Sequence, residues 1–268
     1  MGKPSTAAEG GMLAFFALIG IFALPRFVPD AQVAWALSAV ALVLFCVGVG
    51  LAVNGRPAGL VIDVRNRVSL SKFQAAAWTV LVLSALITAA MVRLGMSSHA
   101  GNVLDIIIPS NLLAAMGISA TSLVATPVVL SQKRNQTPVD GMEAQTADKL
   151  GDAPSSLASD GKVYGRNDPA LARWMDMFRG DEVNTAASPD LSKVQQFLVT
   201  IVVLMAYGGG LWTMFGTTSA DQLTSLPDFS SQMAWLVGIS HAGYLAYKAA
   251  PHGATADPAA SVPETAVG

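Results

Sequence analysis

His241 is the one ionisable residue that the sequence places deep inside an apolar stretch. Such a residue in a membrane-spanning segment is a functional candidate, because lipid accommodates it only when it is paired or buried against protein. A neutral histidine can also be satisfied by a serine or a backbone carbonyl on a neighbouring helix. Two interpretations of His241 therefore stay open: a structural hydrogen bond and a place in the lining of a solute path.

Four further polar residues match in type and spacing. Gln74 and Thr79 of one apolar stretch recur as Gln195 and Thr200 of another, each pair within a motif Ser-Lys-x-Gln-x4-Thr. We expect these side chains to hydrogen-bond between helices. The alternative is that they line a cavity open to the cytoplasm.

The sequence favours few other chemistries. It has one cysteine, no His/Asp/Glu cluster with metal-ligand spacing, and no glycine loop followed by Gly-Lys-Ser/Thr. A net charge of −2 provides no basic surface for nucleic acid. We therefore expect no metal, no cofactor, no nucleic-acid partner and no enzymatic activity.

The elements that must position these residues are membrane helices. Hydrophobic residues make up 52% of the 268-residue chain and charged residues 13%, whereas soluble domains carry about 25% charged residues. A helix crosses the bilayer with about 20 apolar residues, and the lipid interior admits no unpaired backbone groups. The sequence predicts an all-α, polytopic protein whose six spans lie at 12–24, 32–53, 73–92, 111–130, 194–215 and 231–247, the first being the weakest.

Lysine and arginine are unevenly distributed among the predicted loops. Residues 55–72 and the stretch after residue 130 carry most of them, whereas the opposite loops hold only Arg26 and Arg93. Positively charged loops of membrane proteins remain in the cytoplasm. Both termini and the long loop are therefore predicted to be cytoplasmic.

Two pairs of landmarks indicate an internal repeat. The Ser-Lys-x-Gln-x4-Thr motifs begin at Ser71 and Ser192, and the two Gly-Ile-Ser elements begin at Gly117 and Gly238, so both offsets are 121 residues (192 − 71 and 238 − 117). With the predicted orientation, both hairpins enter from the cytoplasm as parallel repeats. The predicted units are an N-terminal hairpin (1–54), a first repeat (55–131), a loop (132–190), a second repeat (191–250) and a tail (251–268).

Small residues spaced by four mark a packing seam between the repeats, because they let helix backbones approach closely in lipid. A solute site at the same positions is the alternative. The expected helix-packing residues are Gly117, Ser119, Thr121, Gly238, Ser240 and Ala242.

The composition of the long loop and of the tail predicts disorder, with one exception in the loop. Residues 169–179 read as a short amphipathic helix that begins after the cap Asp168. It is expected to lie in the membrane interface or to dock on a partner or on the protein's own cytoplasmic face. Its apolar residues are Leu171, Trp174, Met175 and Phe178. Residues 59–70 alternate weakly and fit either a short hairpin or an interfacial segment.

The two motifs, the two Gly-Ile-Ser elements, the run from Gly238 to Tyr244 and the pattern Arg173-Trp174-x3-Phe178-Arg179-Gly180 together resemble a family of uncharacterised bacterial inner-membrane proteins. The resemblance covers about residues 59–251, although the second copy has Val199 where the first has Trp78. It implies a bacterial inner-membrane location and no particular activity.

Three function classes follow. The first is a non-enzymatic scaffold or accessory subunit of a membrane complex, self-associating or bound to other subunits, because the spans carry small-residue seams and no buried carboxylate, lysine or arginine. The second is a channel or facilitator for a small solute or ion, lined by the polar residues of the repeats. An intramembrane enzyme is supported only by His241.

Overall fold

The structure is a computed structural model that describes residues 4–95, 102 and 104–252. This part of the chain is all-helical, and its β-bridges are isolated. Its α-helices are α1 (Pro4–Phe27), α2 (Ala31–Asn54), α3 (Leu70–Leu94), α4 (Ser110–Arg134), α5 (Met142–Leu150), α6 (Leu191–Thr217) and α7 (Ser231–Ala249). Short 3-10 helices are η1 (Gly59–Val61), η2 (Pro154–Ser156), η3 (Pro169–Leu171), η4 (Trp174–Phe178) and η5 (Ala220–Gln222).

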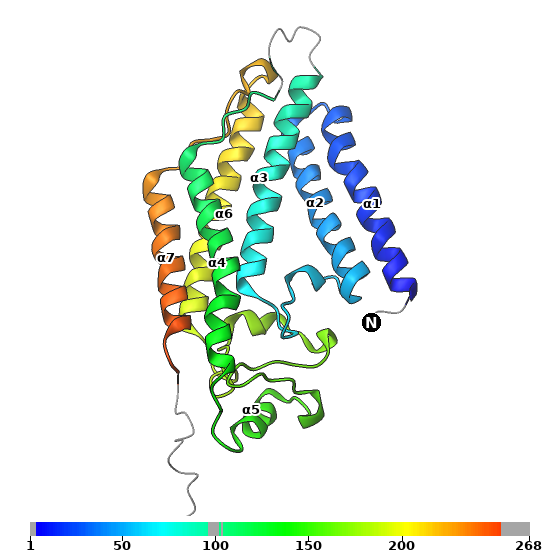
Figure 1. Cartoon of the computed structure of the whole chain (residues 1–268). Helices are drawn as coiled ribbons and strands as arrows, with labels where there is room; N and C mark the ends of the chain where they lie inside the picture. Colours follow the sequence, from blue (N-terminus) through cyan, green and yellow to red (C-terminus); the bar gives the residue numbers. More distant parts are fainter. Residues whose placement is uncertain (1–3, 96–101, 103, 253–268) are drawn as a thin grey trace, which may run out of the picture.

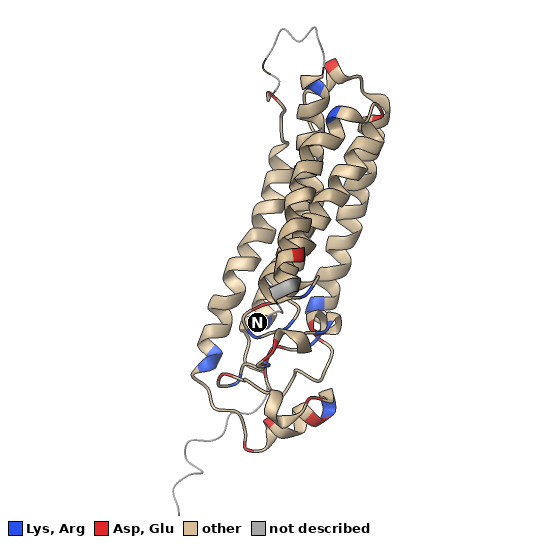
Figure 2. Ribbon diagram, turned by 90° about the vertical axis from the view of Figure 1, so that its right-hand side faces the viewer, with Lys and Arg blue, Asp and Glu red and all other residues tan. Residues whose placement is uncertain are grey.

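The long helices lie side by side in a bundle, with α5 and the loop that contains it at one end (Figure 1). The start of α1 and the end of α7 lie at this same end, called the loop end below (Figure 1). Charged residues gather at the two ends of the bundle (Figure 2). Five helices, α1, α2, α3, α4 and α6, are long and apolar enough to cross a membrane, so the protein is of the multi-pass type, with its apolar helices in contact with lipid.

Helices α1 and α2 form the N-terminal hairpin through close glycine contacts. A Cβ added to Gly48 would lie 2.6 Å from the backbone nitrogen of Ala14, and one added to Gly10 would collide with the backbone of Ala52. Asp30 caps α2, because its carboxylate accepts a hydrogen bond from the Val33 amide at 2.9 Å. The small-residue seam of this molecule therefore lies in the N-terminal hairpin.

The main apolar core joins α3, α6 and the turn before α7. Trp78 and Tyr207 both make edge-to-face contacts with Phe229, at ring-centroid distances of 6.1 and 5.7 Å. Leu211 of α6 is fully buried beside them. This aromatic packing fixes α3 and α6 relative to each other, and with them the polar side chains one or two turns nearer the loop end.

The prediction of a disordered loop is wrong. Residues 135–190 include α5 and three 3-10 helices, and Tyr164, Val183 and Ala186 of this segment are at most 1% exposed. The composition rule counts charged residues as solvated, whereas here Arg166 pairs inside the protein with Asp152 and Asp176, both at 2.8 Å. The charges hold this segment together.

The predicted amphipathic helix at 169–179 is also wrong, because two 3-10 helices, η3 and η4, replace it. Asp168 caps η3 as expected. The backbone then becomes extended at Ala172 and Arg173, where the Arg173 amide donates to the Asp176 carboxylate at 2.8 Å. That hydrogen bond ends one helix and starts the next.

The segment before α3 is a hairpin, one of its two expected forms. Ile62 and Val68 form an antiparallel bridge around a turn in which Asn66 has φ 57°. The Asn66 amide donates to the Arg166 carbonyl at 2.6 Å, so the hairpin is attached to the loop. Of the predicted tail, residues 253–268 lie outside the described residues.

Candidate functional site

A buried polar cluster joins α3 and α6 inside the bundle. The Gln74 amide donates to the Thr200 hydroxyl at 2.6 Å, and the Gln196 amide donates to Gln74 Oε1 at 3.1 Å. All three residues are at most 2% exposed. Each buried amide thus finds its partner on the opposite helix, as a polar group inside a membrane protein requires.

His241 extends this cluster to α7 and α4. Its Nδ1 lies 3.0 Å from Nε2 of Gln196 and 2.6 Å from the Ser122 hydroxyl. Because an amide nitrogen only donates, Nδ1 is an acceptor here and the imidazole proton is on Nε2. Within the described residues, His241 Nε2 has no hydrogen-bond partner although the residue is only 2% exposed.

Three hydroxyls meet nearer the loop end. Tyr244 Oη lies 3.3 Å from Ser71 Oγ and 3.4 Å from Thr126 Oγ1, and these two oxygens are 3.2 Å apart. The residues come from α7, α3 and α4 and are all buried. One turn further along α7, the Lys248 ammonium lies 4.8 Å from the centre of the Tyr244 ring. Buried polar residues therefore follow one another from His241 to the loop end.

At the loop end, the Asp181 carboxylate lies close to four positively charged side chains. Asp181 Oδ1 is 2.9 Å from Arg65 and 3.0 Å from Lys193, while Oδ2 is 2.9 Å from Lys248. Arg67 lies further away, at 4.0 Å. Burial alone would raise the pKa of the Asp181 carboxyl, but the positive charges of Lys193, Lys248 and the arginines hold that pKa well below its usual value.

This arrangement fastens the loop to two helices and to the hairpin before α3. Arg65 comes from the hairpin before α3, Lys193 from α6 and Lys248 from the end of α7. Because a buried carboxylate among cations is stable only when all remain paired, the loop is held on the bundle as a unit. It closes the loop end of the polar cluster.

A second ion-pair cluster shapes the loop itself. Asp152 accepts from Arg166, from the Tyr164 hydroxyl and from Arg173, each at 2.8 Å. Burial, together with the Asp152 carboxylate, raises the pKa of the Tyr164 phenol above its usual value. These contacts stabilise an ordered surface at the loop end.

Among the predicted polar residues, Gln74 and Thr200 hydrogen-bond between helices, as expected, and His241 joins the same cluster through Gln196. Gln195 and Thr79 do not, because both are exposed on the outside of the bundle and the Thr79 hydroxyl donates to its own helix at Ala75. The prediction for these two residues is wrong.

The predicted helix-packing residues divide in the same way. Ser119 and Ser240 are buried, but within the described residues their hydroxyls lack hydrogen-bond partners. Gly117, Thr121 and Ala242 are exposed, and nothing lies within 4 Å of a Cβ added to Gly117. The prediction that the Gly117 face packs against a helix is therefore wrong. A Cβ added to Gly238 would only touch Ile118, at 3.5 Å.

Several buried polar residues of α6 and α4 were not predicted from the sequence. The spacing of buried positions along each helix identifies them, whereas alignment of the two repeats does not. Lys193, Gln196, Thr200, Val203 and Tyr207 recur at steps of three and four and are the buried face of α6. Ser122 and Thr126 follow Ser119 on α4 at the same steps. A one-residue shift corresponds to about 100° around a helix, which moves a side chain from core to lipid.

The apolar residues around η4 divide between one that packs on the bundle and two that are exposed. Phe178 packs edge-to-face on Phe197 of α6 at 5.0 Å, so this end docks on the protein's own bundle. Trp174 and Met175 are 56% and 57% exposed and are free to contact lipid headgroups or a partner. Leu171 is partly buried.

Within the described residues, no three or more His, Cys, Asp and Glu side chains are placed to hold a metal ion. Comparisons of the chain with protein-family models, curated proteins and solved structures found no match.

Proposed function

We propose that the chain is a six-span protein of the bacterial inner membrane, with both termini cytoplasmic, that acts as a non-enzymatic scaffold or accessory subunit of a membrane complex. The observation that carries the proposal is the use of mid-bundle polar groups for helix packing. Gln74 and His241 both bond to Gln196, and the larger cavities of the described residues are lined by other side chains.

The sixth span would be α7. Its 19 residues extend about 28 Å at 1.5 Å per residue, close to the hydrocarbon thickness of about 30 Å. It is less apolar than the five other candidates because it carries Ser240, His241 and Lys248, but these side chains are buried against α4, α6 and the loop. Its lipid-facing side stays apolar, with Trp235 and Ile239 exposed.

The orientation rests on charge. Most lysines and arginines lie at the loop end, where α1 also starts and α7 also ends (Figures 1 and 2). Cytoplasmic loops of membrane proteins carry this excess of positive charge, which supports a cytoplasmic loop and cytoplasmic termini.

The parallel repeat is supported by matching buried faces, at an offset of 122 residues rather than 121. Gln74 corresponds to Gln196 (196 − 74 = 122), and Ser119 corresponds to His241 (241 − 119 = 122). On α3 and α6 the buried positions at this offset also include 78 and 200, 85 and 207, 89 and 211, and 93 and 215. The buried faces would thus repeat one residue out of step with the sequence motifs, and one residue corresponds to about 100° around a helix.

A surface groove offers a contact for another membrane chain. Gly238 and Ala242, with Trp235 and Ile239, line a hollow of about 510 Å³ between α4 and α7. Small residues at a helix surface allow close approach of a further helix in lipid. The predicted packing residues of α7 would then serve contacts between chains, with a second copy or with another subunit.

The test is purification in mild detergent followed by mass measurement of the intact particle. We expect an oligomer or a defined complex, and we expect Gly238→Leu to dissociate it by filling the groove. Gly209→Leu is the matched control, because Gly209 of α6 is exposed and nothing lies within 4 Å of an added Cβ. A lone wild-type monomer contradicts the proposal.

One observation favours a second function, a facilitator for a small solute or ion. Gln196 Oε1, His241 Nε2 and the hydroxyls of Ser119 and Ser240 are buried without partners within the described residues, and such groups suit a passing polar solute. Liposome flux that falls in His241→Ala and Gln196→Leu, and not in Gln195→Leu, supports this alternative. Flux that none of these variants changes removes it.

A further inference from the structure

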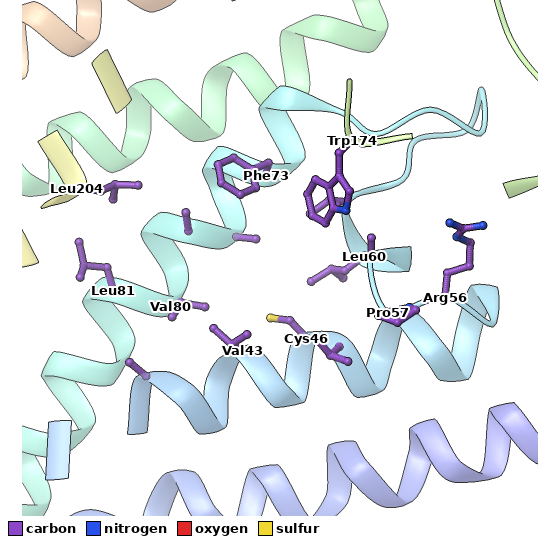
Figure 3. A pocket seen from close by; sticks show the side chains of 16 residues that line it. Val43, Cys46, Arg56, Pro57, Leu60, Phe73, Val80, Leu81, Trp174 and Leu204 are labelled. Atoms are coloured by element: carbon purple, nitrogen blue, oxygen red, sulfur yellow. The ribbon is translucent and has the colours of Figure 1, made fainter. Parts of the chain in front are cut away.

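An apolar cavity of about 700 Å³ separates the N-terminal hairpin from the rest of the bundle near the loop end. In Figure 3, Val43 and Cys46 of α2 form one wall, and Phe73 and Val80 of α3 form the other. Its volume falls within the range of about 300–1,000 Å³ that is typical of small-molecule sites. A cavity of this size between membrane helices has room for an apolar ligand.

The cavity is elongated along the helices. On α2 it is lined from Ala39 to Val47, and the segment that follows this helix continues the lining at Arg56 and Pro57. The lining residues Ala39 and Val47 are separated by about 12 Å along the axis of α2 at 1.5 Å per residue. Arg56 and Pro57 fold back against Gly50, so they extend the lining to about 16 Å from Ala39. One leaflet of the hydrocarbon core is about 15 Å deep, half of about 30 Å. The cavity therefore spans the depth of one leaflet, as an acyl chain does.

The mouth of the cavity carries a positive charge. The Arg56 guanidinium donates to the Ala170 carbonyl, and within the described residues no carboxylate lies within ion-pair distance of it. By contrast, Arg65 and Arg166 at the same end are paired with carboxylates. Arg56 can therefore bind an anionic group that approaches the mouth.

Trp174 indicates the level in the bilayer at which the cavity opens. Its indole lines the cavity opposite Leu60 and is 56% exposed (Figure 3). Tryptophan prefers the headgroup level of a bilayer, where one part of the ring is apolar and the other wet. Arg56 and Trp174 together place the polar part of a ligand at the headgroup level and its apolar part between α2 and α3.

We propose that this cavity binds one anionic phospholipid from the leaflet at the loop end, with an acyl chain between α2 and α3 and the phosphate on Arg56. The lipid fills space that the side chains of the N-terminal hairpin leave open, so it ties α1 and α2 to the other helices. This binding site is independent of the scaffold function.

The test is native mass spectrometry of the full chain, purified from an equimolar mixture of phosphatidylglycerol and phosphatidylcholine. We expect one retained phosphatidylglycerol per chain and a preference over phosphatidylcholine on the order of tenfold. Arg56→Gln abolishes the preference. Arg26→Gln is the control, because Arg26 is an exposed arginine at the opposite end of the bundle, and it leaves the preference unchanged.

Two further measurements separate cavity binding from general lipid adhesion. Ala77→Phe fills the cavity and removes the adduct, whereas Ala120→Phe, on an exposed face of α4, retains it. Cys46, the single cysteine, lines the cavity, so added phosphatidylglycerol slows its alkylation by an apolar maleimide. Equal retention of both lipids, an adduct that survives Ala77→Phe, or alkylation that lipid does not slow overturns the proposal.

Discussion

The side-chain amide of Gln196 donates to Oε1 of Gln74 at 3.1 Å and also reaches Nδ1 of His241 at 3.0 Å. Gln196 thus connects α3, α6 and α7 through one amide group. Gln195, the residue that matches Gln74 in the repeated motif, is exposed. The two adjacent glutamines therefore differ in environment although they are identical in chemistry.

Replacing these glutamines separates the two environments. Gln196→Leu removes the donor to Gln74 and to His241, so we expect it to lower the free energy of unfolding by about 1 kcal/mol. Gln195→Leu faces lipid and changes it by less than about 0.5 kcal/mol. Unfolding by SDS titration in mixed micelles measures both. Equal losses from the two variants would place Gln195 in the core and contradict the helical phase of α6.

Asp181→Asn is expected to release the loop from the bundle. It leaves Lys193, Lys248 and Arg67 buried without their carboxylate, and breaking a buried ion pair in this way costs about 3–5 kcal/mol. Limited proteolysis of residues 135–190 and thermal unfolding are the measurements. Asp160→Asn is the control, because this carboxylate is 64% exposed in its pair with Arg134 and such pairs contribute about 0–1 kcal/mol. A loop that stays protease-resistant in Asp181→Asn argues against its anchoring role.

The attachment of the loop to the bundle is expected to weaken as the pH falls. The pKa values of Asp63 and Asp152 are lowered, and that of Asp181 is well below its usual value, because nearby arginines and lysines outweigh the effect of burial. A carboxyl group whose pKa is lower in the folded state than in the unfolded state stabilises the folded protein. This stabilisation is fully present at pH values above the unfolded-state pKa of about 3.9. It is lost as the pH falls through the folded-state pKa.

Hydrogen exchange of the loop amides, corrected for the intrinsic pH dependence of exchange, is therefore expected to show constant protection from pH 7 to about 4. Protection then falls at lower pH. In Asp181→Asn protection is already lower at pH 7, because the loop is released, and its further fall is shallower, because one of the linked carboxyls is missing. Loss of protection between pH 7 and 5 in the wild type would mean that other groups control the attachment.

Two glycines distinguish the real small-residue seam from the predicted one. A Cβ on Gly48 would lie 2.6 Å from the backbone of Ala14, whereas one on Gly117 would meet nothing within 4 Å. We expect Gly48→Val to force α1 and α2 apart and to cost about 1–3 kcal/mol. Gly117→Val is expected to leave stability unchanged in the same SDS titration. The reverse order of the two effects would restore the Gly117 face as a helix contact.

The sequence by itself determined where the long apolar helices lie and which residue types carry the polar chemistry. Long apolar stretches must form helices in lipid, because no other structure satisfies the backbone of a single segment. His241, Gln74 and Thr200 stood out for the same reason, since polar groups at such positions need partners. Ser69 and Asp190 cap α3 and α6 in the structure, as serine and aspartate side chains commonly do at helix starts.

Only the tertiary structure decided which face of each helix is buried and what holds the loop. In a membrane helix the lipid-facing and core-facing positions are both apolar, so composition does not reveal the phase, and the phase separates Gln196 from Gln195. The loop is ordered because Asp181 meets Arg65, Lys193 and Lys248, which come from distant parts of the chain. Local composition carries no information about such pairing, because ion pairs depend on distances that only the packed helices set.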